Sequence, residues 1–167
     1  FRQETEDSNY RACLSRLCQT MDWDIGHIVA VSGMSGKLSG CDIWEGRDDM
    51  LLRNFKEQSD KLSQDSLNEI PTTTIKELKV SWVSDYSEKA NFIRSAALRE
   101  GENPCAVWIP IVLSDQLVAI IELFSLKQHL YSDTYLNFFN LTGMQIARAI
   151  EHVRWHEAER DKIAQLA

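Results

Sequence analysis

The chain has 167 residues, enough for one domain with a single hydrophobic core. Its formal net charge is −7 and its Lys and Arg residues form no basic stripe, which argues against non-specific binding to nucleic acid. The longest uninterrupted apolar run, Leu117 to Ile121, is far shorter than a membrane span, so we expect no direct membrane contact.

The cysteines favour a reducing compartment. They stand at positions 13, 18, 41 and 105, with no CxxC pair among them and no signal segment before them. Reduced thiols in a cytoplasmic protein are the simplest interpretation. The first residue is Phe1 rather than methionine, which suggests a fragment or a processed product of a longer protein.

The first half of the chain alternates between helical and extended patterns. Behind capping oxygens at residues 7–9, apolar side chains recur at spacings of three and four and predict a helix. Changes in this period then predict further elements. In chain order, the expected elements are a helix at 10–21, strands at 23–31 and 38–44, a helix at 49–63, a loop at 63–71 and a strand at 72–83.

The second half centres on two apolar runs of strand length. Residues 105–125 predict a β-hairpin, because the short polar segment Ser114–Gln116 is the place where the chain can turn. A short helix is expected before it at 87–99, ended by a glycine and a proline. After it, Ser132 and Asp133 predict the start of a helix that continues to the end of the chain.

These patterns together predict an α+β fold. Consecutive strands joined by tight turns must pair antiparallel, and the chain lacks the strand–helix–strand alternation of a parallel sheet. We expect five to six strands. The first and last helices each carry an apolar face that one side of the sheet can bury, and the shorter helices are expected over a pocket on the other side.

Six segments, in this order and spacing, resemble the GAF domain family, the PAS-related regulatory modules of sensor kinases, cyclases and phosphodiesterases. The resemblance is to domains of multidomain bacterial sensor histidine kinases. The segments are 18–27, 43–44, 82–85, 91–94, 108–111 and 121–125. Relatives usually carry a glycine-rich segment before the central strand, whereas residues 68–74 contain no glycine.

The resemblance implies a ligand pocket at the junction of a strand and a helix. Its candidate residues are Trp82, Asp85, Phe92, Arg94, Trp108 and Glu122. The fork of Arg94 suits a carboxylate or a phosphate, and a tryptophan would add an apolar wall. The sequence favours a simpler alternative for Asp85, which would cap the helix and pair with Arg94. For Glu122 it favours a solvated sheet edge, or a position against an arginine, over a ligand contact.

We expect no catalytic residue, metal site or cofactor. His152 and His156 at spacing i, i+4 could hold a metal, but no third ligand completes the site and a solvated helix face is favoured. Residues 96–98 lack the Cys-His pair of bilin-binding relatives. Free methionine sulfoxide reductases of this fold use a Cys-Asp dipeptide, where this chain has Ser84 and Asp85.

The resulting hypothesis is a non-catalytic sensory domain at residues 1–153, followed by a signalling helix at 154–167. It would bind an unknown small molecule, form a homodimer through its terminal helices and relay a signal to an output domain absent from this chain. The parent protein would be a sensor histidine kinase of a two-component system, or a diguanylate cyclase. Two alternatives stay open: a thiol enzyme or redox sensor using Cys41 and Cys105, and a ligand-free dimerisation module.

Overall fold

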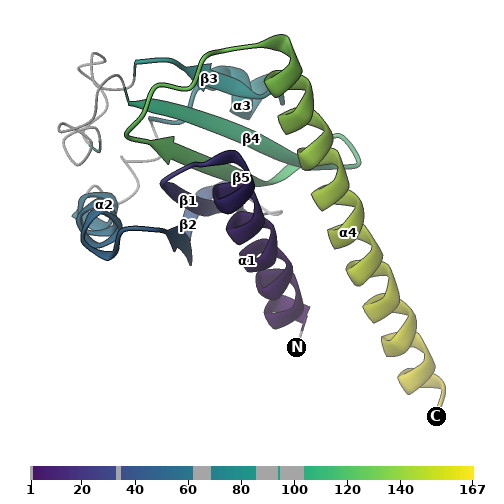
Figure 1. The fold of residues 1–167 in the computed structure, drawn as a ribbon. Helices are drawn as coiled ribbons and strands as arrows, with labels where there is room; N and C mark the ends of the chain where they lie inside the picture. Colours follow the sequence, from purple (N-terminus) through teal and green to yellow (C-terminus); the bar gives the residue numbers. More distant parts are fainter. Residues whose placement is uncertain (1, 33–34, 62–68, 86–93, 95–103) are drawn as a thin grey trace.

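The computed structural model describes residues 2–32, 35–61, 69–85, 94 and 104–167, and within them the chain forms one antiparallel sheet with helices on both sides (Figure 1). The strand order is β2-β1-β5-β4-β3. In chain order, the elements are α1 (Arg2–Met21), β1 (Ile25–Val31), β2 (Leu38–Gly46), α2 (Asp49–Lys61), α3 (Thr72–Lys76), β3 (Ser81–Val83), β4 (Cys105–Leu113), β5 (Gln116–Ser125) and α4 (Asp133–Leu166). The predicted α+β class is confirmed.

The hairpin of β4 and β5 forms the middle of the sheet, as the sequence predicts. Its strands pair along their whole length, from Cys105 opposite Ser125 to Leu113 opposite Gln116. Ser114 and Asp115 make the turn with φ angles of 49° and 61°. Positive φ at both central residues is the geometry of a two-residue hairpin turn, so the turn is tighter than expected and Gln116 already belongs to β5.

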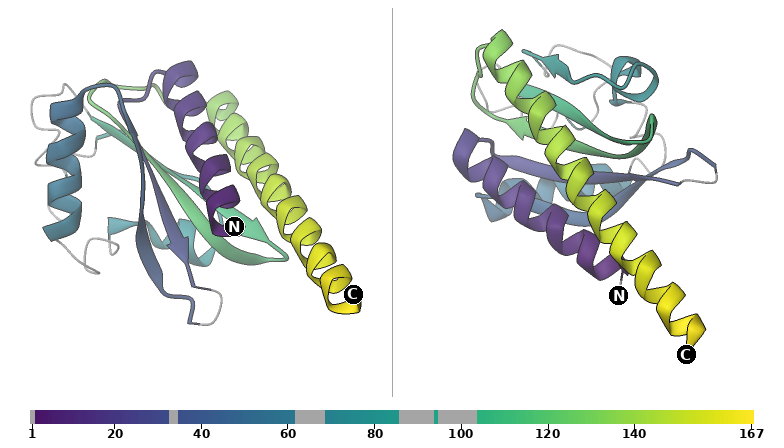
Figure 2. Two further views of the ribbon diagram at one scale, coloured as in Figure 1. Left: turned by 90° about the horizontal axis from the view of Figure 1, so that it is seen from below. Right: turned by 90° about the vertical axis from the view of Figure 1, so that its right-hand side faces the viewer.

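The first and last helices cover one face of the sheet, as predicted. They lie side by side on it, with the sheet between them and α2 (Figure 2). Leu14 of α1 and Phe139, Ile146 and Ile150 of α4 are buried in one core cluster with Ile109 of β4. The second cluster lies on the opposite face, where Phe55 of α2 packs with residues of β1, β4 and β5.

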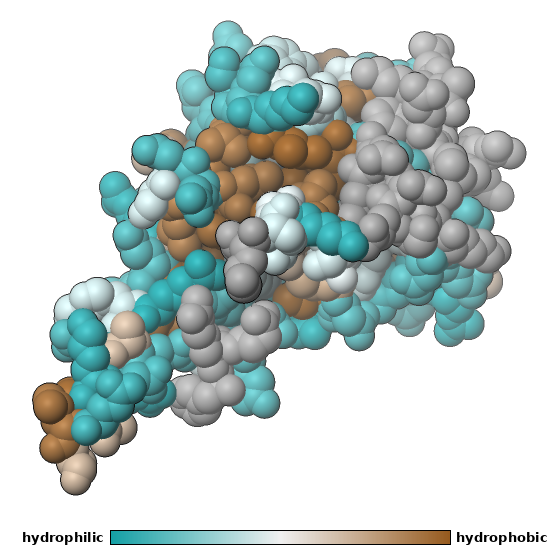
Figure 3. Space-filling model, turned by 180° about the vertical axis from the view of Figure 1, so that it is seen from behind, coloured by the Kyte–Doolittle hydropathy of each residue, from teal (hydrophilic) through white to brown (hydrophobic). Residues whose placement is uncertain are grey.

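Helix α4 begins at the predicted cap and extends well past the sheet. The side chain of Ser132 accepts a hydrogen bond from the backbone N–H of Tyr135 at 3.1 Å. Where α4 crosses β4 it has Gly143, and a Cβ there would lie 3.0 Å from the carbonyl oxygen of Pro110. Ile150 is the last buried residue of α4, and Arg154 one turn later still pairs with Glu6 of α1 at 2.7 Å. The end of the helix projects away from the body and carries hydrophobic residues (Figure 3). None of the described helices is long and apolar enough to cross a membrane.

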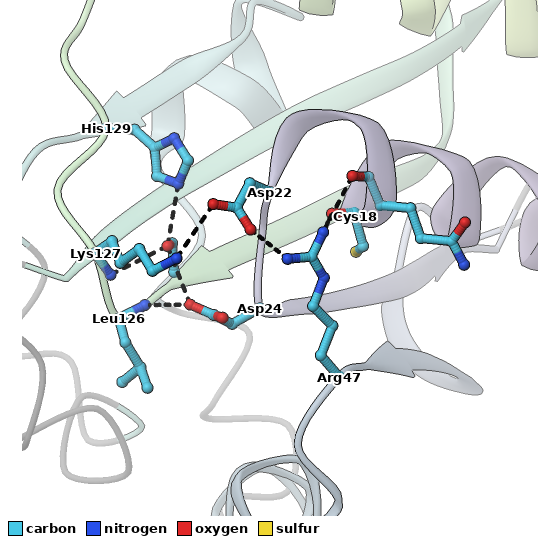
Figure 4. A network of polar contacts seen from close by, with 9 residues as sticks. Cys18, Asp22, Asp24, Arg47, Leu126, Lys127 and His129 are labelled. Atoms are coloured by element: carbon cyan, nitrogen blue, oxygen red, sulfur yellow. Dashed lines mark hydrogen bonds and ion pairs between the residues drawn. The ribbon is translucent and has the colours of Figure 1, made fainter.

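A polar network fixes the end of α1 (Figure 4). The guanidinium of Arg47 donates to the carbonyl oxygens of Cys18 at 2.9 Å and Gln19 at 3.0 Å in the last turn of the helix, and that of Cys18 also accepts from the N–H of Trp23 at 3.1 Å. Arg47 also pairs with Asp22, whose carboxylate accepts from Lys127 at 3.2 Å. The hydrogen bond from Lys127 and that from Arg47 lower the pKa of Asp22. The network therefore connects α1 to the ends of β2 and β5.

The middle of the chain differs from the sequence prediction. The predicted strand at 72–83 is wrong for its first half, where Thr72–Lys76 form α3 and only Ser81–Val83 form β3. Pro71 begins α3, and its carbonyl oxygen accepts from the N–H of Thr74 at 3.0 Å. The hydroxyl groups of Thr74 and Ser81 form a hydrogen bond of 2.6 Å. This tertiary contact favours the helical turn over the extended conformation that threonine usually prefers. The helix expected at 87–99 lies outside the described residues, except for Arg94.

Candidate functional site

Three neighbouring strands bring three polar side chains into one row across the sheet. Glu122 lies on β5, opposite His27 of β1 on one side and Trp108 of β4 on the other. Side chains of directly paired residues project from the same face of a sheet. Trp108 is in the core cluster that contains Phe55 of α2, so this face is the one that α2 covers.

Glu122 is the centre of this row. Its carboxylate is fully buried and accepts hydrogen bonds from the indole N–H of Trp108 at 3.1 Å and from Nδ1 of His27 at 2.8 Å. Arg94 adds a two-pronged contact, with Nη1 at 3.0 Å and Nη2 at 2.8 Å from the two carboxylate oxygens. The expected solvated edge is wrong, because β5 lies between β1 and β4. The alternative position against an arginine is confirmed.

Arg94 bridges two carboxylates. Its side chain is 1% exposed, and its Nε donates to Glu69 at 2.7 Å while its backbone N–H donates to the other oxygen of Glu69 at 3.1 Å. The guanidinium carbon lies 5.1 Å from the ring centre of Phe124 and 5.5 Å from that of Phe55. Every part of the arginine fork thus meets either a negative charge or the face of an aromatic ring.

His27 completes the group. Its Nδ1 faces Glu122, and its Nε2 lies 2.9 Å from the carbonyl oxygen of Cys41. Each ring nitrogen of His27 therefore lies within hydrogen-bond distance of an oxygen acceptor. The ring stacks on Trp44 with 3.7 Å between ring centres.

We call Glu69, Arg94, Glu122, His27 and Trp108 the charged cluster. Its two carboxylates face the guanidinium of Arg94, and Glu122 also faces the imidazole ring of His27. Burial by itself raises the pKa of Glu122, but the charge of Arg94 and the hydrogen bonds from His27 and Arg94 outweigh it, so the pKa of Glu122 is lowered and the carboxylate stays ionised. The cluster is a hydrogen-bonded set of buried groups in a place where isolated charges would be very costly.

Three of the predicted site residues meet in the charged cluster, namely Arg94, Trp108 and Glu122. Trp82 does not, which corrects its assignment to the pocket. It pairs with Val107, one residue before Trp108, and so faces the other side of the sheet. There its ring centre lies 5.8 Å from that of Trp23 and 5.9 Å from that of Phe139, beneath α4.

The other two predicted residues, Asp85 and Phe92, are not among the residues of the charged cluster. Asp85 follows β3, and Phe92 lies outside the described residues. The sequence favoured Asp85 as the partner of Arg94, whereas the structure pairs Arg94 with Glu69 and Glu122. Glu69 has no sequence signal that would have singled it out, since it stands alone before Ile70 and Pro71.

The thiols are poorly placed for redox chemistry. Cys41 lies on β2 and Cys105 on β4, with β1 and β5 between them. Three strand spacings separate them by about 14 Å, whereas a disulfide requires Cα atoms within about 7 Å. Burial raises the pKa of both thiols, and a reactive cysteine needs the opposite shift.

A separate apolar groove of about 480 Å³ runs between α1 and α4, on the outer side of the helix layer. Its lining includes Leu17 of α1 and Phe138, Leu141 and Ile146 of α4. Leu141 is 59% exposed and Phe138 is 39% exposed. Apolar side chains gathered at an open groove are typical of a protein contact surface.

Solved structures with the same fold come from several signalling and enzymatic proteins. A domain ascribed to a two-component sensor histidine kinase of Sinorhizobium meliloti 1021 is 15% identical, with a TM-score of 0.64 over 90% of this chain and 94% of that one. A type II free methionine-R-sulfoxide reductase from Thermoplasma acidophilum is 12% identical, with a TM-score of 0.66 over 92% and 97% of the two chains. At these identities the likeness shows the fold alone.

A third structure is the GAF domain of a phosphoenolpyruvate-protein phosphotransferase from Coxiella burnetii, which is 16% identical with a TM-score of 0.66 over 92% of this chain and 86% of that one. The search of curated proteins found no match. The family model of the GAF domain matches residues 3–151, which is most of the chain. The match runs from the first turn of α1, through all five strands, to the part of α4 that packs on the sheet. The chain therefore belongs to the GAF domain family.

Proposed function

We propose that this GAF domain is a non-catalytic sensory domain of a cytoplasmic signal-transduction protein, with a sensor histidine kinase as the favoured parent and a diguanylate cyclase as the alternative. It binds a small molecule at the charged cluster and passes the signal through α4 to an output domain. The observation that carries the proposal is the full burial of Glu122 in contact with Arg94, His27 and Trp108.

The charged cluster is difficult to explain by stability alone. Replacing a buried ion pair by well-packed apolar residues is often neutral or stabilising. Buried charges held by specific partners are, in contrast, frequent at binding sites. The fork of Arg94, now shared between Glu69 and Glu122, suits a ligand carboxylate or phosphate that competes with Glu69. An anionic small molecule is therefore the ligand class we favour.

The route to α4 passes through one strand. Trp108 of β4 belongs to the charged cluster, and the next residues, Ile109 and Pro110, meet α4 from the other face. A Cβ at Gly143 would lie 3.1 Å from the side chain of Ile109, so the helix rests closely on β4. A shift of β4 must therefore be taken up by α4, because packed layers have no free space to absorb it. The ligand must bind the two arrangements with different affinity.

Native mass spectrometry of the purified domain tests binding, because a retained molecule adds its mass to the chain. We expect a retained mass, or a rise in melting temperature with a panel of small carboxylates and phosphates. Arg94→Lys should abolish either effect, because lysine keeps the charge but loses the fork. Arg148→Lys, on the exposed side of α4, is the matched control. A wild-type domain that retains nothing and responds to no member of the panel would refute the sensory assignment.

Hydrogen exchange tests the relay. With bound ligand, the amides of α4 that follow Gly143 should exchange at a different rate than in the ligand-free protein, and those of α2 provide the comparison for a local effect. Binding that changes exchange around the charged cluster while leaving α4 unchanged would contradict the relay and leave ligand binding intact.

The apolar groove favours a second role, as a homodimer that forms through the terminal helices. Leu141, Phe138 and Leu17 line the groove and offer an apolar contact to the same surface of a second copy. This role does not depend on a ligand. If the charged cluster never binds one, the domain acts only as a dimerisation module, and both roles are separable by experiment.

A further inference from the structure

Two histidines converge on the outside of α4, beyond the sheet. His152 and His156 are both exposed, and their Nε2 atoms lie 3.1 Å apart. We propose that they form a two-ligand site for a transition-metal ion of the Cu²⁺, Ni²⁺ and Zn²⁺ group. The proposal is independent of the charged cluster, which lies on the other side of the sheet.

The distance between the nitrogens fits chelation. With metal–nitrogen bonds of about 2.05 Å, a separation of 3.1 Å gives an angle of about 98° at the metal. That angle lies between the 90° of square-planar or octahedral sites and the 109° of tetrahedral ones. The spacing i, i+4 places both imidazoles one turn apart on one helix face, which is also the arrangement of the two zinc-binding histidines in HExxH helices.

The protonation of the pair is compatible with a metal. Two Nε2 atoms at 3.1 Å cannot both carry a hydrogen that points at the other, so at least one of them presents its lone pair. When both protons are on Nδ1, both Nε2 atoms have a lone pair that can bind a metal. The rings meet edge to face, with centres 4.3 Å apart and planes at 81°.

The ligand set decides which metals fit. Among the described residues, no group of three or more His, Cys, Asp or Glu could hold a metal, so water supplies the remaining positions. Imidazole nitrogen suits Cu²⁺, Ni²⁺ and Zn²⁺, in the usual order of affinity, whereas Mg²⁺ and Ca²⁺ require oxygen ligands. A site with two protein ligands binds reversibly and responds to the metal concentration.

The histidine pair lies on the part of α4 that follows its last buried residue, so a bound metal would affect the stability of this helical segment. Ile150 is the last buried residue of α4, and the next turn is held to α1 by the ion pair of Arg154 with Glu6 rather than by the sheet. A metal that joins His152 to His156 holds one helical turn closed, and so stabilises the part of α4 that leads away from the domain. Metal binding then stiffens the segment 151–166 without touching the core.

Calorimetric titration of metal-free protein with Ni²⁺ at pH 7.5 tests the site. The control variant is H156A/A158H, which exchanges an exposed histidine with an exposed alanine and keeps the composition while moving the imidazole to another face. We expect H152A, H156A and H156A/A158H each to bind Ni²⁺ at least about tenfold more weakly than the wild type.

Hydrogen exchange provides a second readout on the same samples. Ni²⁺ should slow the exchange of amides around 152–160 in the wild type and leave them unchanged in H156A/A158H. All three variants change exposed side chains, so the fold remains intact. Equal Ni²⁺ affinity of the wild type and H156A/A158H would overturn the proposal, as would binding that leaves α4 exchange unchanged.

Discussion

Arg94 holds two buried carboxylates together, and its removal leaves Glu69 and Glu122 without their cation. Arg94→Met keeps much of the side-chain volume and removes the charge. We expect the free energy of unfolding to fall by about 3–5 kcal/mol, the usual cost of breaking a buried pair. Urea denaturation at pH 7 measures it.

The matched control for this variant is Arg148→Met on the exposed side of α4, which should change stability by less than about 0.5 kcal/mol. Adding Glu122→Gln to Arg94→Met should recover part of the loss, because it removes one uncompensated charge. If Arg94→Met is no more destabilising than Arg148→Met, Arg94 does not hold the charged cluster together.

Glu122 gives the protein a specific acid sensitivity. Its pKa is lower in the folded chain than the usual value for glutamate, so its contribution to stability is present above about pH 4.3 and is lost as the pH falls towards the folded pKa. Between about pH 4 and pH 2 the wild type should therefore lose up to about 1.4 kcal/mol per pH unit more than Glu122→Gln. Denaturation curves at pH 7, 4 and 3 measure the difference.

Glu151→Gln, an exposed change on α4, should leave the wild-type acid sensitivity in place. Parallel pH profiles for the wild type and Glu122→Gln would show that Glu122 is not the group responsible.

Sequence reasoning found three of the five residues of the charged cluster. An acidic residue inside an apolar strand drew attention to Glu122, and the family resemblance singled out Arg94 and Trp108. His27 was recognised only as part of a strand, because its role depends on the register that sets it opposite Glu122. Trp82 was assigned to the wrong face for the same reason, since side-chain direction alternates along a strand and its phase is fixed by pairing.

At the scale of secondary structure, Gly143 determines how closely α4 lies on the sheet. In a helix interior, alanine is usually about 1 kcal/mol more favourable than glycine. Here the added Cβ would lie 3.0 Å from the carbonyl oxygen of Pro110, a backbone atom of the sheet that would have to shift by a few tenths of an ångström. We expect Gly143→Ala to reduce the free energy of unfolding by about 1–3 kcal/mol, as overpacking does. Urea denaturation measures the change.

Asn140→Ala provides the control, because this exposed position on α4 gains helix propensity without a new contact. It should be neutral or slightly stabilising. A stabilised Gly143→Ala variant would mean that α4 lies on β4 less tightly than the structure indicates.

The elements with a strong local signal were predicted well. The hairpin at 105–125 and the capped helix after Ser132 have both the pattern and the turn or cap residues that fix their ends. Residues 72–83 have three consecutive threonines, and their β propensity favoured a strand. The structure instead has α3, because Pro71 and the Thr74–Ser81 contact decide the local conformation. The conformation of such short segments is set by tertiary contacts, which the intrinsic β propensity of the residues does not take into account.

At the scale of the whole molecule, the groove between α1 and α4 predicts the oligomeric state. We expect the protein to be a homodimer at micromolar concentration in sedimentation equilibrium. Leu141 is 59% exposed and lines the groove, so Leu141→Glu places a charge in the contact without disturbing the core. Two such charges would face each other across a symmetric interface, and the variant should sediment as a monomer.

Two further samples locate the contact. Asn140→Glu adds the same charge one residue away, outside the groove lining, and should remain dimeric. A chain that ends at Val153 removes Trp155, Ile163 and Leu166, all exposed on the projecting part of α4. If this shortened chain is dimeric and Leu141→Glu is monomeric, the groove forms the interface and the projecting part of α4 is not needed for it. A monomeric wild type would remove the dimer altogether and leave α4 to act within a single chain.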